Sequence, residues 1–305
     1  MHTPKWSGIH SVLITPFDTD GKIDFATYEK QVETNIENGA DGLIACGSTG
    51  EFYALTMAER AELLGQTAKF SNGRVPVIAG VSDLLPANAM ELARTSEKLG
   101  LDGVLAMPPL YAMPDRRETL HYFKQLCSAS GLPVMLYNSP RRAGVGLDVQ
   151  LVSELAELPT VAAIKDSSGD IVQVSELARR LGDRLSVFVG YETMIRPALS
   201  VGAVGVVAMA HQLSGRLVRT YFDACAANDQ ATIDRLEPAL FAIYACFKQG
   251  SYYAGIKAVM NTLGQSAGLP REPLLPFTAD QMAKVETILA DNNVAAAIKQ
   301  AGEHA

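Results

Sequence analysis

The stretch VAAIKDSSGD, residues 161–170, sets the pattern of the whole chain: a short apolar run that ends abruptly in polar residues. The apolar residues before Lys165 do not alternate with polar ones, which is typical of a strand covered on both faces. Seven other runs are similar: HSVLITPF (10–17), DGLIACGS (41–48), VPVIAGVS (75–82), GVLAMPPL (103–110), PVMLYNSP (133–140), LSVFVGYE (185–192) and GAVGVVAMA (202–210). The sequence therefore predicts eight buried, parallel strands.

Segments with helical spacing separate these runs. Residues 56–70, TMAERAELLGQTAKF, begin with a Thr and a Glu three positions later, which is a capping box. Residues 88–100, NAMELARTSEKLG, end with Lys and then Gly, a signal that stops a helix. Strands that alternate with helices eight times predict an α/β fold, a (β/α)8 TIM barrel. A doubly wound sheet is the alternative, but it usually has fewer strands and a glycine-rich nucleotide motif that this sequence lacks.

The strand pattern stops near residue 228. We expect residues 1–228 to form the catalytic barrel and residues 229–305 to form a C-terminal helical region. Within the second part, EPALFAIYACF (237–247) is apolar enough to pack on the barrel or on another subunit.

Composition excludes several classes of partner. The chain has 305 residues, a net charge of −7 and no run of Lys or Arg, so we expect no nucleic-acid partner. No apolar stretch approaches the roughly 18–20 residues of a membrane span, and the N-terminal MHTPKWSGIH has no apolar core typical of a secretory signal. The four cysteines are scattered without a CxxC pair, as is typical of free thiols. These features predict a cytoplasmic protein without a membrane partner.

Polar residues gather where the predicted strands end. In (β/α)8 barrels the carboxyl ends of the strands carry the active site. Five of these ends are polar: CGSTGE (46–51), PPLY (108–111), YNSPRRAG (137–144), KDSSGD (165–170) and GYE (190–192). The five histidines have no ligand spacing, and carboxylates at the strand ends are few, so we expect neither a metal nor a cofactor.

Lys165 is the most reactive residue at these strand ends. A free lysine is neutral in only about one molecule in a thousand near pH 7.5, but burial at the end of a strand lowers its pKa and frees the amine. A neutral amine attacks a carbonyl and forms a Schiff base. The alternative is a structural lysine that snorkels at the strand ends or forms an ion pair there, for example with Asp166.

Three further features are candidates for the same site. Tyr137 ends the neighbouring strand at the level of Lys165, where a phenol can move protons; a tyrosine that only packs there is the alternative. In GSTGE, the N–H groups of Ser48 and Thr49 are able to hold a carboxylate, although such turns are common. Arg142 is able to pair with a substrate carboxylate, or to be a solvated loop arginine.

At these residues the sequence resembles the dihydrodipicolinate synthase / N-acetylneuraminate lyase family of Schiff-base barrels. The resemblance covers nearly the whole chain and rests on GSTGE (47–51), YNSPxRxG (137–144) and IKDSSGD (164–170). It implies a class I lyase or aldolase that binds pyruvate or a related 2-oxo acid as an imine on Lys165. It also implies a homotetramer built as a dimer of dimers.

The resemblance also implies roles for individual residues. Tyr137 is expected to shuttle protons together with Ser48 or Thr49 and with Tyr111, which would reach into the site of a neighbouring subunit. The residues expected to contact substrate are Gly47, Ser48, Thr49, Arg142, Ser167 and Val207.

The second substrate stays open between members of the family. Arg142 stands where dihydrodipicolinate synthases place the arginine that receives the carboxylate of aspartate semialdehyde. However, Ser48 replaces the first Thr of the usual GTTGE, as in the lyases and several 2-keto-3-deoxy acid aldolases. We expect a dihydrodipicolinate synthase-like enzyme. The alternatives are a catabolic 2-keto-3-deoxy sugar acid aldolase or dehydratase, a hydroxy-oxo acid aldolase, a hydroxyproline-pathway deaminase, or a binding barrel without turnover.

Overall fold

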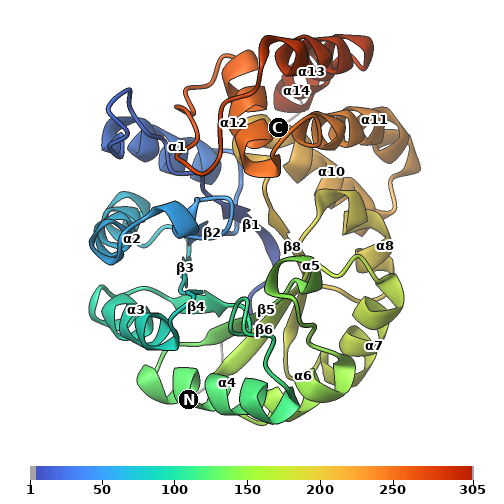
Figure 1. Cartoon of the computed structure of the whole chain (residues 1–305). Helices are drawn as coiled ribbons and strands as arrows, with labels where there is room; N and C mark the ends of the chain where they lie inside the picture. The colour runs from blue at the N-terminus through green and yellow to red at the C-terminus, as the bar shows by residue number, and fades with distance from the viewer. Residues whose placement is uncertain (1–4, 304–305) are drawn as a thin grey trace.

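Eight parallel strands close into a barrel in chain order, with β8 hydrogen-bonded to β1. The computed structural model describes residues 5–303 and shows the strands in the centre and the helices around them (Figure 1). The strands are β1 Gly8–Val12, β2 Gly42–Ala45, β3 Val77–Gly80, β4 Gly103–Ala106, β5 Val134–Asn138, β6 Val161–Asp166, β7 Ser186–Val189 and β8 Gly205–Ala208. The predicted (β/α)8 TIM barrel is confirmed.

One main helix follows each strand on the outside of the barrel (Figure 1). These helices are α1 Phe25–Glu37, α2 Met57–Ser71, α3 Pro86–Lys98, α4 Arg116–Ala129, α6 Val149–Leu155, α7 Ile171–Leu181, α8 Ile195–Ser200 and α10 Arg216–Ala227. The capping box predicted at Thr56 forms with Glu59 and starts α2. Short turns lie near the strand ends: η1 Phe52–Ala54, α5 Pro140–Ala143, η2 Glu192–Met194 and α9 His211–Ser214.

The predicted strand runs extend beyond the strands themselves, and two of them show the reason. The run 10–17 continues five residues beyond β1, to Phe17, as buried and mostly apolar chain, and there Ile14 N–H donates to the side chain of Gln212 rather than to a strand. The run 202–210 likewise extends past both ends of β8, because Ala203 lies buried before the strand and Ala210 leads into α9. Burial of these flanks, rather than sheet pairing, explains their apolar character.

The strands separate two apolar layers, which explains why their sequences do not alternate. One layer fills the barrel interior with side chains such as Val12, Ile44, Met135, Phe188 and Val207. The other layer packs between the strands and the surrounding helices. Both faces of the strands are buried, with only Gly8 at the start of β1 partly exposed, as expected for a parallel sheet covered by helices.

The C-terminal part of the chain adds four helices on one side of the barrel, at the top of Figure 1 in orange and red. They are α11 Gln230–Phe247, α12 Tyr252–Thr262, α13 Ala279–Asp291 and α14 Val294–Glu303. Helix α11 packs against α10 of the barrel, and α12 packs against α11. Within residues 5–303, no helix combines the length and the hydropathy needed to cross a bilayer.

Candidate active site

Lys165 and Tyr137 lie side by side at the carboxyl ends of β6 and β5. The strand register pairs their Cα atoms, and Lys165 Nζ lies 4.1 Å from the centre of the Tyr137 ring. Both side chains are buried, with 5% and 6% of their surface exposed. Alternate residues of a strand face opposite sides, so Lys165 shares the interior face of β6 with Ala163. The amine is therefore presented at the top of the barrel, beside a phenol.

The surroundings of Tyr137 favour the loss of its proton. Burial alone raises the pKa of the phenol, but the positive charges of Lys165 and Arg142 oppose this effect. The nearby hydroxyls of Ser48 and Ser139 also favour the ionised form, and together these groups hold the pKa of Tyr137 below its ordinary value. Tyr137 is thus suited to exchange a proton with groups that react at Lys165.

Asp166 does not pair with Lys165, so the predicted alternative of a structural ion pair is wrong. Its carboxylate accepts hydrogen bonds from Asn138 Nδ2 and Gln173 Nε2, both at 2.7 Å. It also accepts the N–H of Ser168 at 3.0 Å. These bonds fix the loop after β6 and leave Lys165 without a carboxylate partner among residues 5–303.

Gly190, at the end of β7, leaves the space that Lys165 and Ser167 occupy. A Cβ at position 190 would lie 1.9 Å from Ser167 Oγ and 2.9 Å from Lys165 Cε. Ser167 is buried, and its hydroxyl has no hydrogen-bond partner in the described part of the chain. Val207 lies on the interior face of β8, in the same interior layer as Tyr137. The structure therefore brings Ser167 close to Lys165 and places Val207 in the interior layer that contains Tyr137.

The GSTGE segment forms a tight turn after β2. Gly50 N–H donates to Gly47 O, and Glu51 N–H donates to Ser48 O. Within residues 5–303 the N–H groups of Ser48 and Thr49 have no hydrogen-bond acceptor, and both residues are buried. The turn is thus positioned to present two N–H groups and two hydroxyls to an anionic group near Tyr137.

The backbone before this turn adopts an unusual conformation. Cys46 has a φ of +54°, which a non-glycine residue adopts at a cost in free energy. Its carbonyl oxygen lies only 2.2 Å from where a Cβ on Gly80 would be, so glycine is required on the neighbouring strand.

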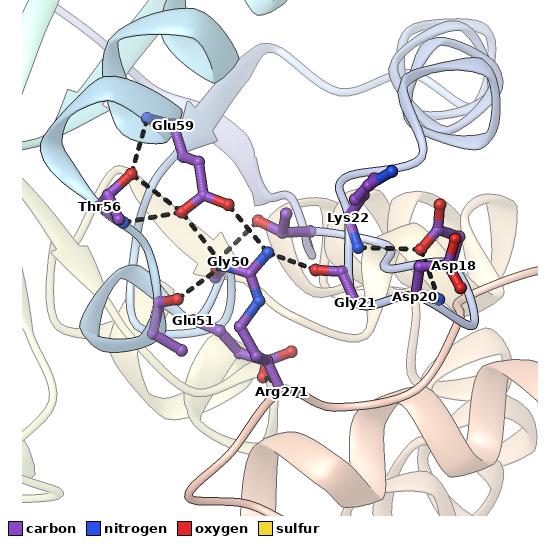
Figure 2. Close-up of polar contacts among 11 residues, drawn as sticks. Asp18, Asp20, Gly21, Lys22, Gly50, Glu51, Thr56, Glu59 and Arg271 are labelled. Atoms are coloured by element: carbon purple, nitrogen blue, oxygen red, sulfur yellow. Dashed lines mark hydrogen bonds and ion pairs between the residues drawn. The ribbon is translucent and has the colours of Figure 1, made fainter.

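The C-terminal region fixes the other end of the GSTGE turn through Glu51. Its carboxylate is fully buried, pairs with Lys257 Nζ at 2.5 Å and accepts the N–H of Arg271 at 3.0 Å. The Arg271 side chain then bridges Glu59 of α2 and the carbonyl of Gly21 (Figure 2). Glu51, one of the three carboxylates at the strand ends, therefore has a structural role.

Arg142 lies on the short helix α5 and stacks on tyrosines that sequence reasoning missed. Its guanidinium lies 4.5 Å from the ring centre of Tyr253 and 5.8 Å from that of Tyr252, both on α12. Tyr253 is buried, and its pKa is raised by burial and by the nearby Tyr137. The motif YNSPRRAG gives no signal for these partners, because they are more than 100 positions away in the sequence.

Tyr111 is separated from these residues within one chain. It follows β4, adopts a φ of +68°, and exposes 90% of its surface. The structure therefore brings together Lys165, Tyr137, Ser48, Thr49 and Arg142, while Tyr111 points away into solvent.

A cavity of about 660 Å³ opens beside these residues at the mouth of the barrel. Its lining comes from the ends of β5, β6 and β7 and from α11 and α12. The lining residues are Ser139, Arg141, Arg142, Ser168, Gly169, Tyr191, Thr193, Met194, Tyr244, Lys248 and Tyr252. Among the described residues, no three His, Cys, Asp or Glu side chains come together as metal ligands.

Similarity to known proteins extends over almost the whole chain. The model of the dihydrodipicolinate synthetase family matches residues 5–292. A 4-hydroxy-tetrahydrodipicolinate synthase of Oceanobacillus iheyensis is 32% identical over 285 residues, which cover 92% of this chain and 95% of that protein. An uncharacterized DapA-like lyase of Rhizobium meliloti is 34% identical over 92% of this chain and 94% of its own length.

Solved structures agree with the sequence relatives. Dihydrodipicolinate synthase DapA-2 of Bacillus anthracis has a TM-score of 0.91 and 29% identity, with 95% of this chain and 99% of that chain covered. The synthase of Acinetobacter baumannii, solved in complex with pyruvate, has a TM-score of 0.88 and 27% identity, with 95% and 100% covered. The predicted family is therefore confirmed, and the chain belongs to the dihydrodipicolinate synthetase family, a family of lyases.

Proposed function

We propose that this protein is a Schiff-base lyase that makes or breaks a carbon–carbon or carbon–oxygen bond next to an imine of pyruvate or a related 2-oxo acid. The Lys165 amine attacks the C2 carbonyl, water leaves, and a protonated imine forms. Loss of a proton from C3 gives an enamine, which attacks the carbonyl of a second substrate. Hydrolysis then returns the amine, so no oxidant or reductant is consumed.

One observation carries this proposal: a buried lysine that has no carboxylate partner among residues 5–303 lies 4.1 Å from the ring of a buried tyrosine whose pKa is lowered. In the proposed reaction Tyr137 moves protons between the amine, the leaving water and C3, with the hydroxyl of Ser48 or Thr49 as a relay. Reduction with borohydride in the presence of pyruvate tests the imine directly.

The residues around this pair are assigned to substrate binding. We assign the free N–H groups of Ser48 and Thr49, after Gly47, to the carboxylate of the 2-oxo acid. Ser167 contributes its unpartnered hydroxyl, and Val207 contributes an apolar wall below the substrate. Residues 1–228 form the catalytic unit in this proposal, and residues 229–305 form a helical region that supports it.

The preferred reaction is the condensation of pyruvate with aspartate semialdehyde, as the names of the synthase relatives suggest. The second candidate is a catabolic aldolase, dehydratase or deaminase acting on a longer oxo acid. Ser48 in GSTGE and the 660 Å³ cavity favour this second candidate function. Turnover assays with aspartate semialdehyde and with a panel of 2-keto-3-deoxy acids separate the two.

Replacing Arg142 with Gln is expected to weaken recognition of a carboxylate on the second substrate. A charged, two-pronged contact is lost, so kcat/KM for aspartate semialdehyde should fall by about 10²-fold, or about 2–3 kcal/mol. Trapping with pyruvate alone should change far less. The matched control is Arg179→Gln, an exposed arginine on α7, which should behave like the wild type. Equal losses in pyruvate trapping and in turnover would instead indicate that Arg142 binds pyruvate.

The assembly we propose is a homotetramer of two tight dimers in the cytoplasm. Four exposed apolar residues support a dimer face: Leu84, Leu85, Tyr111 and Met113. They lie on the loops after β3 and β4, which are joined by the bond from Met107 N–H to Ser82 Oγ. In this proposal the face is covered by a second copy, and Tyr111 completes that copy's site.

Replacing Leu84 with Asp is therefore expected to weaken the dimer and to lower turnover. A buried charge without a partner costs several kcal/mol, so the assembly should dissociate at micromolar concentration and lose about tenfold in activity. Sedimentation velocity and kcat, both measured over a dilution series, check this. Leu275→Asp places the same charge on an exposed leucine outside this face and should leave the assembly unchanged. A Leu84→Asp protein that still sediments as a tetramer would contradict the assignment.

A further inference from the structure

The cavity at the barrel mouth carries charge of one sign only. Its charged lining residues are Arg141, Arg142 and Lys248, and no carboxylate lines it in the described part of the chain. None of the three forms an ion pair among residues 5–303, although the chain as a whole has a net charge of −7. A pocket lined by one sign of charge concentrates its field and attracts the opposite charge.

The carboxylates Glu51, Asp166 and Glu192 at the strand ends are held in structural contacts and do not line this cavity. Glu51 pairs with Lys257, and Asp166 accepts from Asn138, Gln173 and Ser168. Glu192 is fully buried, where it accepts a short hydrogen bond from the Tyr244 hydroxyl and another from the N–H of Ala210. None of these groups is free to neutralise the cations or to receive the hydroxyls of a neutral polyol.

The three cations come from two parts of the fold. Arg141 and Arg142 lie on α5, directly after the strand that carries Tyr137. Lys248 lies at the end of α11, one turn after Tyr244 and before Tyr252, so the corner between α11 and α12 forms the outer wall. Arg142 lies close enough to Tyr137 to lower its pKa. Lys248 belongs to the C-terminal helices and not to a segment that directly follows a barrel strand, so we place it at the outer side of the cavity.

We propose that Lys248, together with Arg141, forms an outer anion subsite that selects substrates with a carboxylate at the end remote from the imine. This inference rests on the proposed imine at Lys165 and names the substrate class that it favours. The carbon chain of such a substrate extends from C3 of the imine towards the mouth. The substrate class is therefore a 2-oxo acid, or an adduct of one, that carries a second carboxylate.

The test uses trapping alone, so it does not depend on which lyase reaction the protein catalyses. Wild-type protein is reduced with borohydride in the presence of 2-oxoglutarate, 2-oxoadipate or 2-oxopimelate, and of the ester of each at the remote carboxyl. For the diacid that traps best, half-maximal labelling of Lys165 should need at least about tenfold less acid than ester. Added salt should reduce this preference, because it screens exposed charges.

Variants of Lys248 test whether this side chain causes the preference for the diacid over its ester. Lys248→Gln should lower the acid-over-ester preference about fivefold, and Lys248→Glu should lower it about twentyfold, as expected for a partly exposed charge. Lys284, which is exposed on α13, is the matched control. Lys284→Gln and Lys284→Glu should keep the wild-type preference.

The outcomes separate this inference from the proposed function. If pyruvate does not label Lys165, the Schiff-base function fails and the subsite fails with it. If pyruvate labels Lys165 but no diacid traps better than its ester, the subsite alone is wrong. A preference that survives Lys248→Glu, or that falls equally in Lys284→Glu, also overturns the assignment to Lys248.

Discussion

Replacing Lys165 with Ala is expected to abolish both the borohydride adduct with pyruvate and all measurable turnover. The proposed reaction passes through a covalent bond to Nζ, so no other interaction replaces it. In the wild type, reduction should add the three-carbon acid to the peptide that contains Lys165. Mass spectrometry of the digested protein checks this, and circular dichroism shows whether the variant still folds.

Lys257 is the lysine that most resembles Lys165 and therefore tests most strictly whether Lys165 forms the imine. It is as buried as Lys165, and burial lowers its pKa, so burial alone does not separate the two lysines. However, Lys257 Nζ pairs with Glu51 at 2.5 Å and donates to Leu269 O at 2.9 Å, contacts that favour its charged form. Label on the Lys257 peptide, or on that of Lys248, would contradict the proposed role of Lys165.

The barrel and the central pair were predictable because local sequence carries their signals. Eight apolar runs without alternation require strands with two covered faces, and only a few folds provide that. Once the strands are placed, the position of a residue along its strand determines its level along the barrel axis. This is why Tyr137 and Lys165 were expected at one level, and the register pairs them.

The outer half of the site was not predictable, because it depends on packing between distant segments. Tyr252, Tyr253 and Lys248 lie in a region where the sequence indicates only apolar helices. Their approach to Arg142 depends on how α11 and α12 dock on the barrel, which no local pattern encodes. The same holds for Gly190, whose role appears only when the side chains of Lys165 and Ser167 are seen beside it.

The charge of Glu192 at the site was also not predictable from the sequence. In the sequence it is a carboxylate at the end of a strand, which is a natural candidate for contact with substrate. In the structure it is fully buried against Tyr244, burial raises its pKa, and the Tyr244 hydroxyl and the Ala210 N–H occupy its oxygens. A charge counted from sequence is therefore a poor measure of the charge that a substrate meets.

Replacing Tyr137 with Phe is expected to keep substrate binding and to slow catalysis by about 10²- to 10⁴-fold, mainly in kcat. The phenyl ring still fills the interior face of β5 and still lies beside Lys165, so packing is preserved. What disappears is the hydroxyl, whose pKa is lowered despite burial by the charges of Lys165 and Arg142. Without it, the proposed proton transfer between the amine, the leaving water and C3 loses its central group.

Separate measurement of imine formation and turnover tests this role. Single-turnover trapping should show that the Tyr137→Phe protein forms the pyruvate adduct more slowly but to the same final extent, because the amine and the binding groups are unchanged. Tyr253→Phe is the matched control: it removes the hydroxyl of another buried tyrosine beside Arg142, but one that does not stack with Lys165, so its loss of kcat should be much smaller. A kcat of the Tyr137→Phe protein within a few-fold of the wild-type value would contradict this role. Another group would then transfer the proton, and the lowered pKa of Tyr137 would only reflect the charges of its neighbours.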